Sequence, residues 1–120
     1  MIRFLRGVRH ALSGLGHGVR RERNFQIELA LGLVAIGMAW WLRISRIEWL
    51  AVAICCGVVL SAELFNTAIE KLADTVELGH NEQIRVVKDV AAGAVLLASV
   101  ASLVVGAAVF LPYLAAIVRS

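Results

Sequence analysis

Long apolar runs constrain the fold of this chain more than any other feature of its sequence. No charged residue occurs in residues 49–62 or 90–118, and the run 25–42 is interrupted only by Gln26 and Glu28. A helix needs about 20 mainly apolar residues to cross the hydrocarbon core of a bilayer. Hydrophobic residues make up 60% of the chain, against roughly 45–50% in a soluble domain. The sequence therefore predicts an all-α integral membrane protein.

Four helices are expected within a single domain, residues 1–120. Apolar residues at steps of mostly three and four, with arginines and histidines between them, predict an amphipathic surface helix over residues 1–23. The three membrane-spanning helices are expected at residues 25–44, 47–76 and 83–118. A polar loop at 78–82 should join the last two spans. Cys55 and Cys56, adjacent within the second span, are interpreted as packing residues.

The distribution of basic residues indicates how the spans are oriented. Six of the 12 Lys and Arg residues precede the first apolar run: Arg3, Arg6, Arg9, Arg20, Arg21 and Arg23. Because basic residues beside membrane spans favour the cytoplasmic side, we expect a cytoplasmic amino terminus, with residues 71–89 on the same side. Arg43 and Arg46, in a tight turn on the opposite side, count weakly against this orientation. The basic segment is interpreted as membrane-proximal and not as a nucleic-acid surface.

Polar residues at helical spacing on the second span form the candidate working site. They follow one another at steps of three, four and four, and so share one helix face: Glu63, Asn66, Glu70 and Asp74. A carboxylate inside the membrane costs about 2.5 kcal/mol or more unless it is paired, hydrated or bound to a cation. A helix end that has left the membrane would explain Asp74 without any function, but it explains Glu63 poorly.

Other polar residues are expected at the same membrane boundary, namely Glu22 and Glu28 beside the first span and Lys88 and Asp89 beside the third. Mg²⁺ is commonly held by one or two carboxylates plus phosphate oxygens, and a lysine can bind the phosphates themselves. A further carboxylate could take a proton from a hydroxyl. Together these groups are typical of phosphoryl transfer, although the sequence contains neither a P-loop nor a protein-kinase motif.

These residues belong to motifs that resemble the prokaryotic diacylglycerol kinase family. The motifs are residues 62–70 (AELFNTAIE), then Asp74, then residues 88–95 (KDVAAGAV). Residues 20–26 (RRERNFQ) and 47–49 (IEW) are more similar to the Gram-positive branch, whose members phosphorylate undecaprenol. The resemblance covers nearly the whole chain. It implies an ATP-dependent lipid kinase of the bacterial cytoplasmic membrane that uses Mg²⁺ and assembles as a homotrimer.

The resemblance also implies a role for each matching residue. Glu63 matches the catalytic base that deprotonates the lipid hydroxyl, and Glu22 and Glu70 match the carboxylates that hold the metal. Asn66 matches a residue that orients the phosphate and, with Glu63, contacts the lipid substrate. Nucleotide or phosphate contacts are implied at five positions: Arg3, Asn66, Glu70, Lys88 and Asp89.

The sequence differs from the family motif at one place, and three alternative functions stay open. Relatives often carry a histidine ahead of the Lys-Asp pair where this chain has Asn81, preceded by His80, so the adenine contacts of this loop are not assigned. Diacylglycerol is an alternative to undecaprenol, because the active-site residues would be identical. A small multidrug-type transporter would use a lone glutamate near the middle of a span, whereas these carboxylates gather at one boundary. A structural membrane subunit would need the polar face only for helix pairing.

Overall fold

Helices account for nearly all of the described chain. The computed structural model describes residues 1–76 and 81–120. Its helices are α1 (Ile2–Arg21), α2 (Arg23–Leu42), α3 (Arg46–Val76) and α4 (Glu82–Arg119), and the described residues contain no strand. The all-α architecture expected from the apolar runs is therefore confirmed. Residues 78–80 of the expected polar loop lie outside the described residues.

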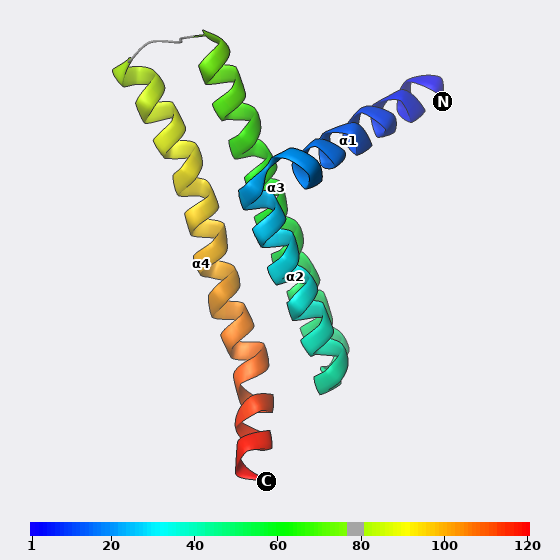
Figure 1. Cartoon of the computed structure of the whole chain (residues 1–120). Coiled ribbons are helices and arrows are strands. Elements are labelled where there is room, and N and C mark those ends of the chain that lie inside the picture. Colours follow the sequence, from blue (N-terminus) through cyan, green and yellow to red (C-terminus); the bar gives the residue numbers. More distant parts are fainter. Residues whose placement is uncertain (77–80) are drawn as a thin grey trace.

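Helices α2, α3 and α4 form one elongated bundle, and α1 lies outside it. Helix α3 packs against both α2 and α4, whereas α1 projects sideways from the end of α2 (Figure 1). The direction changes at Glu22, whose extended backbone (φ −109°, ψ 110°) separates α1 from α2. The amino terminus consequently lies far from the bundle, and only the last turns of α1 reach it.

The three bundle helices have the length and composition of membrane spans. Helices α2, α3 and α4 each contain an apolar stretch suited to crossing a bilayer, and only 11%, 17% and 6% of those stretches is buried inside the chain. Apolar surface left exposed on this scale is compatible with lipid as the solvent. The chain is therefore an integral membrane protein. The placement of α1 at the membrane surface remains a prediction.

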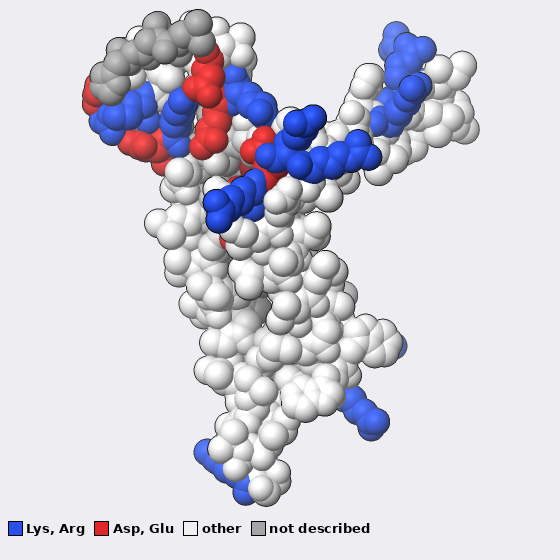
Figure 2. All heavy atoms as spheres, viewed as in Figure 1, with Lys and Arg blue, Asp and Glu red and all other residues white. Residues whose placement is uncertain are grey.

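Helices α3 and α4 are longer than a bilayer core requires. With 31 and 38 residues, they measure about 46 and 57 Å at 1.5 Å per residue, against roughly 30 Å of hydrocarbon. Charged side chains occupy the ends of these helices that adjoin the segment 77–80, at the side of the bundle where α1 joins α2 (Figure 2). The charged ends can thus reach water while the remaining length stays in lipid. Asn81 starts α4 there, since its Oδ1 accepts from the backbone N–H groups of Gln83 and Ile84.

The opposite end of the bundle is held together by the turn between α2 and α3. Arg43 adopts a left-handed conformation (φ 56°), and the next N–H, that of Ile44, donates to the Ala39 carbonyl at 3.3 Å. Ser45 and Glu48 then cap α3 reciprocally: Glu48 N–H donates to Ser45 Oγ, and Ser45 N–H donates to the Glu48 carboxylate at 2.9 Å. The tight turn expected at residues 43–46 is thus a helix stop followed at once by a capping box.

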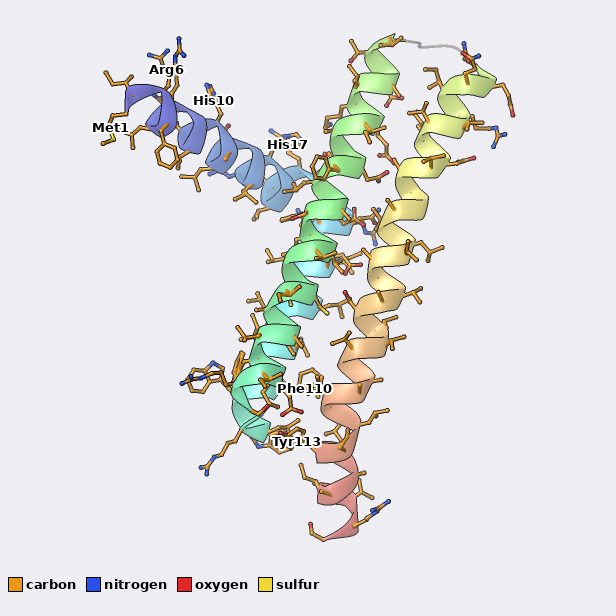
Figure 3. All side chains as sticks on the ribbon, turned by 180° about the vertical axis from the view of Figure 1, so that it is seen from behind. Met1, Arg6, His10, His17, Phe110 and Tyr113 are labelled. Atoms are coloured by element: carbon orange, nitrogen blue, oxygen red, sulfur yellow. The ribbon has the colours of Figure 1, made fainter. Side chains whose placement is uncertain are left out.

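Helix α4 is attached to this turn by an apolar cluster and one hydrogen bond. The buried members of the cluster come from both sides of the turn and from α4: Ala39, Ile44, Val52 and Val109. Phe110 and Tyr113 pack against it (Figure 3). The Tyr113 hydroxyl also donates to Glu48 Oε1 at 2.5 Å. These contacts set the position of α4 relative to α2 and α3 at the end remote from the carboxylates.

Replacing Tyr113 by Phe should lower the unfolding midpoint of the purified protein in detergent by a few degrees, because Glu48 loses a charge-assisted hydrogen bond while the aromatic ring stays packed. Circular dichroism during heating measures this. The same replacement made in a Glu48→Gln background should have a smaller effect, since the charged acceptor is already gone. An equal effect in both backgrounds would contradict the pairing.

Candidate active site

Two polar side chains of α3 are buried in a molecule that buries little else. Glu63 is 5% exposed and Asn66 is 8% exposed. They are the only buried residues with charged or polar side chains in the described part of the chain. Both belong to the helix face predicted from spacing. Burying an ionisable group without a partner is costly, so such positions are functional candidates.

The buried pair has unsatisfied hydrogen-bonding capacity. Asn66 Nδ2 donates to Glu70 Oε1 at 3.3 Å, one turn along α3. Asn66 Oδ1 is buried and accepts no hydrogen bond, and no side chain among residues 1–76 and 81–120 pairs with the Glu63 carboxylate. Buried polar atoms are nearly always satisfied in folded proteins. These atoms are therefore available to a donor or a cation that residues 1–76 and 81–120 do not supply.

A third carboxylate reaches the same place from the junction of α1 and α2. Gly18, in the last turn of α1, lies so close to α3 that a Cβ atom there would be 3.1 Å from Leu64 and 3.2 Å from the Phe25 ring. Gln26 Nε2 also donates to a backbone carbonyl of α1 at 2.8 Å. These contacts hold the bend between α1 and α2 against α3. Glu22 therefore lies beside α3, with Lys71 Nζ 3.5 Å from its Oε1.

The carboxylates form a group that attracts cations. The side chains of Glu22, Glu28 and Glu70 lie near enough to Glu63 to repel a negative charge on it. We refer to these four residues, contributed by the α1–α2 junction, α2 and α3, as the carboxylate cluster. Figure 2 shows acidic side chains beside the point where α1 meets the bundle. A positive ion close to the cluster would relieve this repulsion.

The carboxylate cluster fits a metal that arrives together with phosphate better than a metal bound by protein alone. No group of three or more His, Cys, Asp or Glu side chains arranged to hold an ion by themselves occurs in the described part of the chain. Mg²⁺ does not need one, because it commonly takes one or two carboxylates and completes its shell with phosphate oxygens and water. The repulsion of a charged Glu63 by its three acidic neighbours and the unsatisfied Asn66 Oδ1 are compatible with that arrangement.

Lys88 and Asp89 form ion pairs with residues that do not belong to the carboxylate cluster. Lys88 Nζ lies 2.5 Å from Asp74 Oδ1, an ion pair that joins α4 to α3. Asp89 pairs with Arg85 at 2.7 Å, and Arg85 also pairs with Glu82 at the start of α4. The sequence did not predict either pairing: it placed Asp74 on the polar face of the second span, with a solvated helix end as the alternative, and gave Arg85 no partner. The spacing of Arg85 and Asp89 (i, i+4) was the available signal for the second pair.

Arg3 does not join the carboxylate cluster within this chain. Residues 1–15 are all exposed, and Arg3 lies 14 residues before His17 along one continuous helix. At 1.5 Å per residue that is about 21 Å along the axis. Figure 3 shows His17 beside α3, whereas Met1 and Arg6 lie at the distant end of α1. The phosphate contact implied for Arg3 is therefore not formed by a single copy of the chain.

Two apolar grooves run along the bundle close to these residues. One, of about 630 Å³, lies between α3 and α4, and its lining includes Asn66, Phe65 and Ala91. The other, of about 520 Å³, is lined by α2, α3 and α4, with Glu28 among its residues. Cys55 and Cys56 line this second groove and are free thiols. The first groove places apolar surface suited to lipid chains next to Asn66, and the second places such surface next to Glu28.

The helices span the membrane and hold acidic catalytic candidates beside apolar grooves. This arrangement is typical of integral membrane enzymes that act where lipid meets water. Comparison with known proteins identifies the family. Residues 9–110 match the model of the prokaryotic diacylglycerol kinase family, and the chain belongs to this family of lipid kinases. The match excludes Arg3 but contains every other predicted site residue.

Two similar proteins of known name cover nearly all of the chain. An undecaprenol kinase of Bacillus subtilis (strain 168) is 37% identical over 112 residues, which are 93% of this chain and 91% of that protein. A diacylglycerol kinase of Synechocystis sp. is 36% identical over 110 residues, which are 91% of this chain and 63% of that protein. The resemblance inferred from the motifs is thus confirmed, and the transporter and structural-subunit alternatives are set aside.

Proposed function

We propose that this kinase transfers the γ-phosphate of ATP to the hydroxyl group of a membrane lipid, and that undecaprenol is that lipid. The observation that carries the proposal is the Glu63 carboxylate, buried on a membrane-spanning helix without a partner in the described chain. Similarity to the Bacillus subtilis undecaprenol kinase along 91% of its length supports undecaprenol. Diacylglycerol is the second candidate, favoured by the comparably similar Synechocystis protein.

In the proposed reaction Glu63 is the general base. It takes the proton from the lipid hydroxyl as the lipid oxygen attacks the γ-phosphorus, and the bond from that phosphorus to the β-phosphate oxygen breaks to release ADP. The proton stays on Glu63 until water removes it. Removing the hydroxyl proton in the transition state makes the lipid oxygen a better nucleophile. Asn66, one turn away, would orient the transferred phosphate and hold the lipid hydroxyl in place.

Glu22 and Glu70 are the proposed ligands of the Mg²⁺ that accompanies ATP. Their positions near Glu63, together with the repulsion within the carboxylate cluster, support this assignment. When bound, Mg²⁺ would neutralise charge on the phosphate oxygens. The chain's own contribution is to hold Glu22 at the α1–α2 junction and Glu70 on α3, so that two carboxylates from separate segments lie beside the base.

The remaining assignments are not brought to the carboxylate cluster within one copy of the chain. Lys88 and Arg3 are proposed phosphate contacts and Asp89 a nucleotide contact, yet none of them pairs with the carboxylate cluster in this structure. A homotrimer, as the family resemblance implies, would let a neighbouring subunit supply such residues. It would also cover apolar surface that one chain leaves open. We further propose that α1 lies on the cytoplasmic surface of the bacterial membrane, with its arginines towards anionic lipid.

The experiment that tests this function gives the purified protein Mg²⁺, labelled ATP, and undecaprenol and diacylglycerol in equal amounts. We expect labelled phosphate mainly on undecaprenol. Transfer mainly to diacylglycerol would overturn the choice of lipid while keeping the reaction. Transfer to neither lipid, in a detergent in which the helical content and melting behaviour are preserved, would overturn the proposed function.

A further inference from the structure

Side chains from two helices meet at a single carboxylate oxygen, that of Glu22 between α1 and α2. His17 Nε2 near the end of α1 lies 3.0 Å from Glu22 Oε1, and Lys71 Nζ on α3 lies 3.5 Å from the same atom. The Glu22 side chain is only 24% exposed, whereas Lys71 is 59% exposed. Glu22 is therefore the more enclosed partner of this pair, whereas Lys71 lies largely in solvent.

Lys71 has a special position among the basic residues at this end of the molecule. Within residues 1–76 and 81–120, it is the only Lys or Arg that forms an ion pair with any member of the carboxylate cluster. Lys88 and Arg85, the other basic residues paired at this end, are engaged by Asp74, Glu82 and Asp89. An exposed ion pair contributes little to folding stability. The Lys71–Glu22 pair is therefore of interest because it lies in the carboxylate cluster, and not because it stabilises the fold.

We propose that Lys71 is a counter-cation that neutralises Glu22 before ATP binds and moves to the phosphates of ATP once Mg²⁺ occupies Glu22. The inference rests on the proposed function, because it takes Glu22 as a metal ligand. Lys71 would thus be a phosphate-binding residue of this site, separate from Lys88.

The physical argument is competition for one oxygen atom. A divalent ion at Glu22 Oε1 repels an ammonium group 3.5 Å from that atom. The displaced group stays close, because Lys71 directly follows Glu70, the second proposed metal carboxylate, on α3. A lysine is a compact charge on a flexible four-carbon chain and makes strong contacts with phosphate. Metal binding and nucleotide binding would then be coupled through this one side chain.

The test compares wild-type protein with Lys71→Met in two measurements. In the first, Mn²⁺ is added without nucleotide, and bound ion is followed by electron paramagnetic resonance. The variant should bind Mn²⁺ severalfold more tightly, because the competing ammonium is gone. In the second, the variant should need about tenfold more ATP for half-maximal phosphate transfer, as expected from the loss of one charge-assisted contact. A smaller decrease is expected in kcat.

Two control variants separate this role from a general charge effect. Lys71→Arg keeps the competing charge and should bind Mn²⁺ as the wild type does. Arg119→Met removes a positive charge at the opposite end of α4 and should change neither measurement. If the wild type transfers phosphate but Lys71→Met binds Mn²⁺ no more tightly, or has an unchanged ATP requirement, the inference fails and the proposed function stands. If the wild type transfers no phosphate to either lipid, the proposed function fails, and this inference fails with it.

Discussion

Replacing Glu63 by Gln is expected to lower kcat by about 10²–10⁴-fold, the range that general base catalysis contributes. The amide has nearly the same size as the carboxylate but cannot accept the hydroxyl proton. Glu63 is 5% exposed, and no other buried side chain in the described residues is a carboxylate that could replace it as the base. The rate of labelled phosphate transfer at saturating ATP and lipid measures this loss.

The same substitution should have the opposite effect on stability. Glu63 is buried without a partner and is repelled by Glu22, Glu28 and Glu70. A neutral amide ends this repulsion, so the melting temperature in detergent should stay equal or rise. Glu48→Gln is the matched control, because it removes a carboxylate from the same helix at the remote end and should leave kcat close to wild type. A Glu63→Gln protein with kcat within a few fold of wild type would exclude the proposed base.

Replacing Glu70 by Gln is expected to lower activity roughly 10- to 100-fold at low Mg²⁺, a loss seen even for residues that only orient metal ligands. Higher Mg²⁺ should restore part of the activity, because the variant keeps Glu22 and the phosphate oxygens as ligands but binds the ion more weakly. Initial rates at a series of Mg²⁺ concentrations, with ATP held constant, measure the concentration that gives half-maximal activity.

Asp74→Asn is the control for the Glu70 prediction, since Asp74 lies four residues further along the same helix and pairs with Lys88. Its loss should leave the half-maximal Mg²⁺ concentration unchanged, whatever its effect on the maximal rate. Full activity of Glu70→Gln at low Mg²⁺ would remove Glu70 from the metal site. An activity loss that Mg²⁺ does not relieve would instead point to a purely structural role for its hydrogen bond with Asn66.

Features that depend on one helix at a time could be predicted from the sequence. Apolar runs predicted the long helices, and the structure contains α2, α3 and α4 close to the expected ranges. Spacing placed Glu63, Asn66 and Glu70 on one face, and the Asn66–Glu70 hydrogen bond confirms that neighbourhood. The 3.6-residue periodicity of an α-helix makes such relations local, so no knowledge of neighbouring helices is needed.

Relations between helices could not be predicted in this way. The Lys71–Glu22, Lys88–Asp74 and Tyr113–Glu48 pairs join residues that are 49, 14 and 65 positions apart. Whether two such residues meet depends on how each helix is rotated about its axis and at what angle it crosses its neighbour, and side-chain packing along the whole contact decides both.

Hydropathy and helical periodicity are properties of contiguous residues, so the sequence was sufficient to predict a helical membrane protein with an acidic face on its second span. The lipid kinase family followed from the resemblance of its motifs and not from these patterns. Which carboxylates are buried, and which cations they meet, depends on how the helices pack against one another. The fold brought Glu22, at the bend between α1 and α2, beside α3 through the close packing at Gly18. It also carried Arg3 away from the site along α1, because a continuous helix cannot fold back on itself.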